Sequence, residues 1–240
     1  MRQSTFITVL LVAAFGVSLA IYWYLLPDFI RDGGPLVVGL MVITIMQVTF
    51  IIERGLTLAK AKGRGSMARF AADLLNRVRE RDVNGALALC DAQSGSCASI
   101  MRAGLERYRG VSNDASLSED RKVAEIQEAF DSATGLEIPL LERNLIALST
   151  LASIATLVGL LGTVIGMIRC FKAVARTGAP DAIQLAVGIS EALINTAGGL
   201  FAAIAGIVAY NFFVNQVDGL SYDIEEATHH VVQILTGRKQ

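Results

Sequence analysis

Hydrophobic residues in this chain gather into four long stretches, and a charged region separates the second stretch from the third. The four stretches are residues 6–26, 35–52, 145–168 and 185–213. Each approaches or exceeds the roughly 20 apolar residues that a helix needs to cross a bilayer. The pattern predicts an all-α membrane protein with four transmembrane helices that contact the lipid bilayer.

The side of the membrane that each segment faces follows from the basic residues next to the apolar stretches. The residues after the second stretch include Arg54, Lys60, Lys62, Arg64 and Arg69. Cytoplasmic loops carry an excess of Lys and Arg. Residues 53–144 and the C-terminus are therefore predicted to be cytoplasmic, although three basic residues in the predicted extracytoplasmic loop 169–180 weaken the asymmetry.

Four parts of the chain follow from this orientation. Residues 1–52 form two transmembrane helices joined by a short periplasmic turn at 28–34. Residues 53–144 form a cytoplasmic helical domain, and 145–213 form two further transmembrane helices. Residues 214–240 form a cytoplasmic helix. The first stretch also resembles a signal peptide, because Ser18-x-Ala20 suits cleavage. A retained helix is favoured, since the apolar run continues through an aromatic cluster at 22–24.

The charged region shows helical periodicity. Apolar positions in 67–81 follow the spacing of three and four residues that marks one buried helix face. Shorter helices are predicted at 83–90 and 97–108, and 111–118 is a polar loop. Ser118 then caps a long helix that begins with two acidic residues. Nothing up to Ile168 predicts its end, although Pro139 is expected to bend it.

Composition excludes several classes of function. Of 43 charged residues, 28 lie between Glu53 and Arg143, and the net charge is −1. The chain has no basic stripe with interleaved aromatic residues, so nucleic-acid binding is not predicted. The three cysteines and two histidines do not form a metal-ligand pattern. We predict no cofactor and no metal, and an enzyme is not expected.

Hydroxyl residues form a stripe in the third apolar stretch. Ser149, Ser153, Thr156 and Thr163 recur at helical spacing and therefore share one face. Such a stripe is able to line a hydrated path through the membrane. The alternative is that each hydroxyl bonds its own backbone or packs between helices, as is common for membrane Ser and Thr.

Small residues recur in the third and fourth stretches. Residues of this size let helix backbones approach closely, so the two stretches are predicted to pack tightly in an oligomeric bundle. The glycines concerned are Gly159, Gly162, Gly166, Gly198, Gly199 and Gly206.

Glu191 is the only charged residue between Asp181 and Asp218. A charge in hydrocarbon costs at least about 2.5 kcal/mol, so such residues usually face a bundle interior and often handle protons. Asn195 shares its helix face, whereas Thr196 lies on an adjoining face. Glu191 either belongs to a proton path or is a buried carboxyl group held by Asn195 or a neighbouring hydroxyl.

Two motifs resemble the ExbB/TolQ/MotA proton-channel family, and within it ExbB. They are GLLGTVIGMI at 159–168 and GISEALINTAGGL at 188–200. The resemblance extends to GGP and ERG around the second stretch and to YN at 210–211. Glu191 within GISEAL favours ExbB and TolQ over MotA. The additional N-terminal helix, and Thr156 and Ala205 where many members have proline, depart from the family pattern.

The resemblance implies a proton path and a set of partners. By motif position, Thr163 and Thr196 match pore-lining threonines, Glu191 matches the membrane glutamate, and Asn211 lies near the cytoplasmic mouth. It implies a homopentamer in the bacterial inner membrane around a dimer of ExbD-like single-span proteins. Proton flow would drive this motor and energise a TonB-like protein. TolQ-like envelope components, flagellar or gliding stators, and a non-conducting membrane scaffold stay open.

Overall fold

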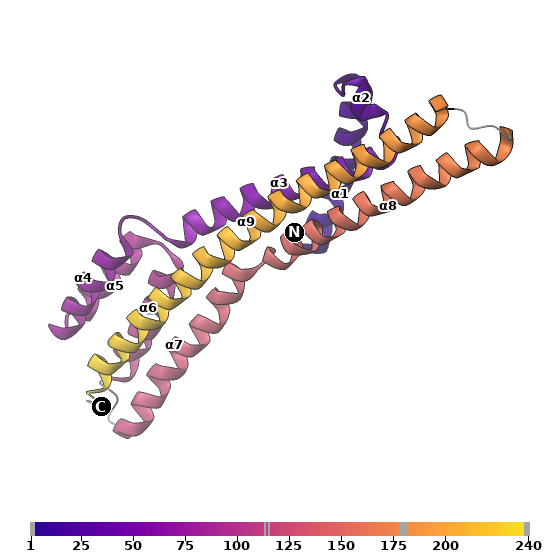
Figure 1. The fold of residues 1–240 in the computed structure, drawn as a ribbon. Helices are drawn as coiled ribbons and strands as arrows, with labels where there is room; N and C mark the ends of the chain where they lie inside the picture. The colour runs from indigo at the N-terminus through magenta and orange to yellow at the C-terminus, as the bar shows by residue number, and fades with distance from the viewer. Residues whose placement is uncertain (1–2, 113, 115, 178–181, 238–240) are drawn as a thin grey trace. The chain divides into compact units, whose positions relative to one another are not determined.

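The computed structural model describes residues 3–112, 114, 116–177 and 182–237, and within these ranges it is helical and contains no strand (Figure 1). The all-α prediction is confirmed. The helices of the described residues are α1 (Gln3–Tyr24), α2 (Asp28–Arg31), α3 (Leu36–Ala61), α4 (Met67–Arg79), α5 (Val83–Gln93), α6 (Ser96–Val111), α7 (Glu119–Glu142), α8 (Leu145–Thr177) and α9 (Ala182–Thr236).

Three helical stretches of the described residues are long and apolar enough to cross a membrane. They are Leu36–Ala61, Glu119–Lys172 and Ala182–Leu235. The apolar part of α1, Thr8–Tyr24, is shorter than these three stretches. The fourth transmembrane helix therefore stays a prediction.

The chain divides into two compact units. The first combines Met1–Glu53 with Asn144–Phe212, and the second combines Arg54–Arg143 with Phe213–Gln240. The first unit holds the apolar stretches, and the second holds most of the charges.

Small residues form the contact between α8 and α9 in the first unit. A Cβ atom placed on Gly159 would lie 3.1 Å from the Gly199 Cα atom, and one placed on Gly166 would lie 2.7 Å from the Gly188 carbonyl oxygen. Positions that increase along α8 contact positions that decrease along α9, so the two helices are antiparallel. The hydrophobic effect supplies little driving force between helices that lie in lipid, so their association depends on dispersion contacts. The close approach of α8 and α9 provides many of these contacts.

Helix α3 joins this pair through both apolar and polar contacts. Ile43 belongs to a buried cluster with Ala155 of α8 and with Ala202 and Ala203 of α9. Gln47 is also buried. Oriented to satisfy both of its polar atoms, the Gln47 amide donates to the Ala202 carbonyl and accepts from the Ala152 N–H, each at 3.2 Å. One amide side chain therefore bonds both neighbouring helices.

The second unit packs α4, α5, α6 and α7 with the C-terminal part of α9. Gly104 of α6 lies directly against the Phe130 ring of α7, where an added Cβ atom would overlap the ring. The fully buried apolar residues that build this core include Leu74, Ile100, Met101, Leu105, Phe130, Ile224 and Val231. Apolar side chains at helical spacing predicted the buried face of α4, and the burial of such faces drives the packing.

Arg54 is a buried cation of the second unit. Its Nη1 donates to the carbonyl oxygen of Leu141 at 3.2 Å, in the last turn of α7. The final carbonyl groups of a helix lack partners within the helix and carry partial negative charge. Arg54 therefore stabilises the C-terminal end of α7.

The long helix predicted to continue from Ser118 to Ile168 is interrupted. Helix α7 ends at Glu142 and α8 begins at Leu145, and Asn144 between them has a φ of +65°. Asn tolerates this left-handed conformation better than most residues, which ends a helix. Pro139 lies inside α7, one turn before the interruption. The interruption, rather than a bend at Pro139, ends the expected continuous helix.

Helix α8 is longer than its apolar stretch predicts. The sequence places a loop at 169–180, but α8 continues to Thr177 and includes Arg169. The predicted end of this helix at Ile168 was wrong, because it was placed where the apolar residues end. A helix continues into polar residues as long as its backbone hydrogen bonds are made. Positions 178–180 of the predicted loop fall outside the described residues.

Candidate functional site

Glu191 of α9 is buried in the first unit and forms an ion pair. Its side chain is 5% exposed, and both carboxylate oxygens lie 2.5 Å from Nη1 of Arg169 on α8, whose side chain is 51% exposed. A guanidinium group is planar, permanently charged and weakly hydrated, which makes it suited to a partly buried pair. The carboxylate is therefore compensated by a cation of the same chain.

The antiparallel hairpin of α8 and α9 brings the pair together. Arg169 and Glu191 each lie eleven residues from position 180, which is the centre of the sequence between them. Because both helices rise about 1.5 Å per residue, residues equally far from the connection reach the same level. The pair follows from the register of the hairpin.

Asn195 lies one turn beyond Glu191 and is fully buried. Its Nδ2 donates to the Glu191 carbonyl oxygen at 2.9 Å and to the Gly33 carbonyl oxygen at 2.7 Å, while its Oδ1 has no partner. The side chain therefore links α9 to the residues before α3. Its second bond crosses 162 positions of sequence, so no local pattern could have predicted it.

Thr196 links the two helices of the hairpin. Its hydroxyl group lies 3.1 Å from the Ala192 carbonyl oxygen of its own helix and 3.3 Å from the Gly159 carbonyl oxygen of α8. The two contacts place Thr196 beside the glycine contact of α8 and α9, next to the face that holds Glu191 and Asn195.

The hydroxyl stripe of α8 bonds its own helix. Ser153 donates to the Ser149 carbonyl at 3.2 Å, Thr156 to that of Ala152 at 3.4 Å, and Thr163 to that of Leu160 at 2.6 Å. These bonds satisfy the hydroxyl hydrogens without a path. Each oxygen still has lone pairs that can accept from water. The structure does not join this stripe to Glu191.

The other predicted site residues lie at different places. Asn211 is exposed on α9, twenty residues or about 30 Å along the helix from Glu191. A Cβ atom placed on Gly162 would lie 2.3 Å from Asn195 Cβ, and one on Gly206 would lie 2.5 Å from the Gln47 side-chain amide. Gly198 is exposed and lies near Leu40. The roles predicted for these residues in the path and in packing stay predictions.

Two polar residues of the membrane unit, Arg169 and Gln47, were not predicted from the sequence to contribute to its buried polar contacts. Arg169 was assigned to a loop, although counting outward from the centre of the hairpin would have placed it opposite Glu191. Gln47 is an uncharged residue of the second apolar stretch, which also holds Thr44 and Thr49, so hydropathy did not single it out. Its amide is the signal, because an unsatisfied amide in hydrocarbon is costly.

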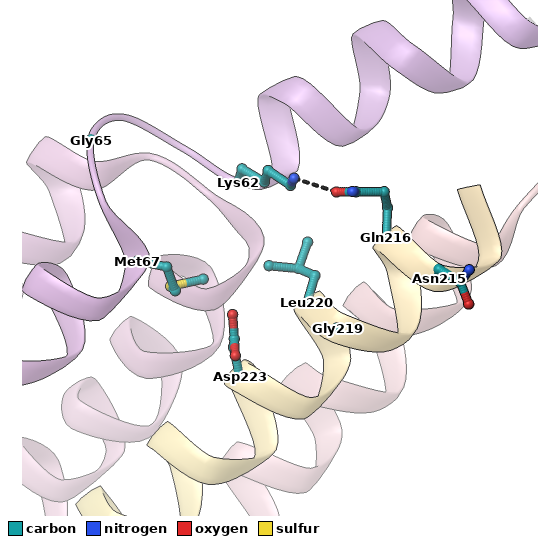
Figure 2. A pocket seen from close by; sticks show the side chains of 8 residues that line it. All are labelled: Lys62, Gly65, Met67, Asn215, Gln216, Gly219, Leu220 and Asp223. Atoms are coloured by element: carbon teal, nitrogen blue, oxygen red, sulfur yellow. Dashed lines mark hydrogen bonds between the residues drawn. The ribbon is translucent and has the colours of Figure 1, made fainter. Parts of the chain in front are cut away.

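The second unit offers a different kind of site. A cavity of about 370 Å³ lies beside Lys62, whose Nζ donates to Oε1 of Gln216 at 2.5 Å; Figure 2 shows the residues that line it. Lys62 and Asp223, which both line it, are exposed. Among the described residues, no three His, Cys, Asp or Glu side chains are grouped to bind a metal. We place the candidate site in the membrane unit, around Glu191, because Glu191 and Asn195 are polar and buried there.

Three bilayer-length helices and a buried polar cluster among them define a multi-pass helical membrane protein. Comparison with known proteins gives the family. Residues 93–226 match the MotA/TolQ/ExbB proton channel family, which is more than half of the chain. The chain belongs to this family.

Relatives carry two different names. A biopolymer transport protein ExbB from Pseudomonas putida is 29% identical over 203 residues, which is 83% of this chain and 58% of that protein. A Tol-Pal system protein TolQ from Pseudomonas aeruginosa is 34% identical, over 62% of this chain and 68% of that protein. TolQ from Haemophilus influenzae is 32% identical, over 78% and 81%. The chain is therefore a channel-family protein of ExbB/TolQ type.

Proposed function

We propose that the chain is the ExbB-like subunit of a proton-driven motor in the bacterial inner membrane. Five copies would enclose a dimer of an ExbD-like single-span protein, and the motor would energise a TonB-like protein for transport at the outer membrane. Residues 53–144 and the C-terminus would face the cytoplasm. The ExbB relative that aligns with 83% of the chain supports this assignment.

The single observation that carries a conducting role is the burial of Glu191 within an apolar stretch. Ionisable residues in membrane helices are rare because of their cost, and those that persist usually belong to substrate or ion pathways. Glu191 lies beside Asn195 and near Thr196, so polar groups gather at one level of the hairpin.

The polar residues would have different roles along the proton path. Thr163 and Thr196, with Ser153 and Thr156, would line it, and Asn211 would lie toward its cytoplasmic end. Glu191 would polarise the path while the proton is carried by an aspartate of the single-span partner. The lone pairs of the α8 hydroxyls are the acceptors available to water in such a path.

Two substitutions test the conducting role. Glu191→Gln removes the charge and Thr163→Val removes the hydroxyl at nearly constant shape, so both variants should assemble. We expect proton-dependent uptake of an outer-membrane cargo to fall to background in both. The measurements are oligomer size after detergent extraction and uptake in cells that lack the native protein.

Matched controls separate the site from general damage. Glu226→Gln changes an exposed glutamate of the same helix, and Thr150→Val changes an exposed threonine of α8 that also bonds its own backbone. Both should retain uptake. Full uptake in Glu191→Gln and Thr163→Val together would refute the proposed function.

A TolQ-like role is the second candidate, favoured by the TolQ relatives at 34% and 32% identity. It would use the same channel with a different partner. Co-purification from cells, followed by identification of the single-span protein and its ratio to this chain, distinguishes the two. Recovery of a Tol-type partner alone would replace the first candidate.

A third candidate is a membrane scaffold that conducts nothing. It predicts that Glu191→Ala retains full function once the assembly forms, because a scaffold needs only its shape. Loss of function with normal assembly would exclude it.

A further inference from the structure

The turn between α2 and α3 lies against the Glu191 carboxylate. Gly34 has a φ of +72°, a conformation that favours glycine, and an added Cβ atom would lie 2.5 Å from Glu191 Oε1. A Cβ atom on Gly33 would lie 2.8 Å from the Ile194 side chain. The turn therefore approaches α9 closely at both glycines, and the φ of Gly34 independently favours glycine there.

The same turn is bonded to the polar cluster. The Gly33 carbonyl oxygen accepts a hydrogen bond from Asn195. A Cβ atom added to Gly34 would lie 3.7 Å from Arg169 Nη1. The turn thus contacts an amide, a carboxylate and a guanidinium that come from α8 and α9. We call this arrangement of Gly33, Gly34, Arg169, Glu191 and Asn195 the latch.

Arg169 is the member that holds the latch together. Glu191 is almost fully buried, and Arg169 contacts both of its oxygens. Removing one partner of a buried ion pair leaves an uncompensated charge and is strongly destabilising. Without Arg169, the Glu191 carboxylate would have to move toward water. It would then leave its present position next to Gly34.

We propose that Arg169 is a positioning residue, which fixes the Glu191 carboxylate in place and so keeps the turn at Gly33 and Gly34 seated on α8 and α9. This inference rests on the proposed function only in that the fixed carboxylate belongs to the proton path. The latch anchors the start of α3 at the level of Glu191. When the latch opens, both the carboxylate and the start of α3 lose their fixed positions.

Hydrogen exchange of the purified full chain in lipid nanodiscs tests the latch without any partner or proton gradient. In Arg169→Gln, we expect amide exchange in residues 28–36 to become about tenfold faster, which corresponds to about 1.4 kcal/mol of local stability. Arg169→Lys keeps the charge and should restore slow exchange in part. Lys172→Gln, an exposed cation of the same helix, should leave exchange unchanged.

A second variant opens the latch from the other side. Gly34→Ala leaves every charge in place but puts a methyl group against Glu191, so exchange in 28–36 should rise as in Arg169→Gln. Because a Cβ atom at a φ of +72° is also strained by the backbone itself, the same change is measured in a Glu191→Ala background. A rise that disappears in this background comes from the contact with the carboxylate, and a rise that persists comes from the backbone and counts against the latch. Gly39→Ala in α3, whose added methyl group meets nothing within 4 Å, controls for the loss of a glycine. These comparisons decide the question even if Arg169→Gln does not fold.

Uptake measured in the same variants tests positioning. We expect Arg169→Gln to lose uptake, Arg169→Lys to recover a measurable share, and Lys172→Gln to match the wild type. Unchanged exchange in both Arg169→Gln and Gly34→Ala would overturn the latch. Faster exchange with normal uptake would overturn the positioning role. Normal uptake in both Glu191→Gln and Thr163→Val would instead refute the proposed function, and the exchange result would still stand.

Discussion

Polar side chains of the membrane unit satisfy one another almost entirely within the chain. Glu191 accepts from Arg169, and Asn195 uses its amide hydrogens on two carbonyl oxygens. In hydrocarbon, each group left without a partner costs several kcal/mol. Among the described residues of this unit, the exceptions are Asn195 Oδ1 and Ser18 Oγ, which are buried and have no partner. Asn195 therefore keeps one acceptor on the face that also carries Glu191.

Cys90 and Cys97 show the opposite strategy, in which a titratable group stays neutral by burial. Burial raises the pKa of the Cys97 thiol to about 12, with a smaller contribution from Cys90. Burial also raises the pKa of Cys90 to about 12, and Asp91 adds to the effect. Both thiols are therefore protonated at neutral pH and are poor nucleophiles.

Alkylation checks this prediction. At pH 8, iodoacetamide should modify Cys90 and Cys97 of the folded protein on the order of a hundredfold more slowly than after denaturation, because only the thiolate reacts. A cysteine introduced at the exposed Ser132 of α7 serves as the reactive control. The raised pKa values also predict a pH dependence of the free energy of unfolding. The two thiols contribute their full stabilisation below about pH 9, and this contribution declines as the pH rises toward 12. Rapid labelling in the folded state would contradict both expectations.

At the scale of elements, the contact between α8 and α9 depends on residues without side chains. Gly199 faces the Ala155 carbonyl oxygen, which would lie 2.7 Å from an added Cβ atom, and Gly159 Cα, which would lie 2.8 Å away. Neither neighbour is a flexible side-chain end, so neither can move without shifting a helix. The two helices approach this closely only because both positions are glycine.

Gly199→Val should therefore separate α8 from α9. Overpacking of a close contact costs typically 1–3 kcal/mol, and we expect a loss of about that size. Denaturant-induced unfolding in detergent, followed by helix content, measures it. Gly39→Val on α3, where an added Cβ atom meets open space, is the matched control. Equal stability of the two variants would show that the glycine contact is not needed.

Periodicity and hydropathy predicted most elements, because both follow from local sequence. The face that includes Phe70 and Leu74 predicted α4, and Ser118 predicted the start of α7, where its hydroxyl accepts from the Arg121 N–H. The end of α7 could not be predicted in this way. Asn ends a helix where its backbone is left-handed, and the sequence does not show that Asn144 adopts this conformation, which the structure gives as a φ of +65°.

The candidate site was predicted only in part, because its contacts are distant in sequence. Glu191 and Asn195 stand out as polar residues in an apolar run, and their shared face follows from the helix period. Arg169 lies outside the apolar run and appeared to belong to a loop. Its partnership with Glu191 depends on the register of two helices, which hydropathy does not contain.

At the scale of the whole molecule, charges and apolar stretches separate into two compact units. The chain passes between the units at residues 53–54, 143–144 and 212–213. The first unit is built for lipid, because its helices place large apolar side chains such as Leu157 and Phe201 on the surface. The second unit has an exposed charged surface, as in proteins that contact water.

Cysteine labelling in intact cells tests the orientation of these units. In a background without native cysteines, a membrane-impermeant maleimide should label Asp28→Cys from the periplasm. It should label Ser132→Cys only after the inner membrane is permeabilised. Both positions are exposed, so a difference in labelling reports the side of the membrane. Labelling of Ser132→Cys in intact cells would reverse the proposed orientation.

The pairing of Arg169 with Glu191 has an electrical consequence. A single charge that moves across a membrane gains or loses about 2.3 kcal/mol for each 100 mV of potential. The cation and the anion of this pair sum to zero, so the potential does no net work when the two side chains move together. The voltage would therefore act on a travelling proton and exert no net force on this ion pair.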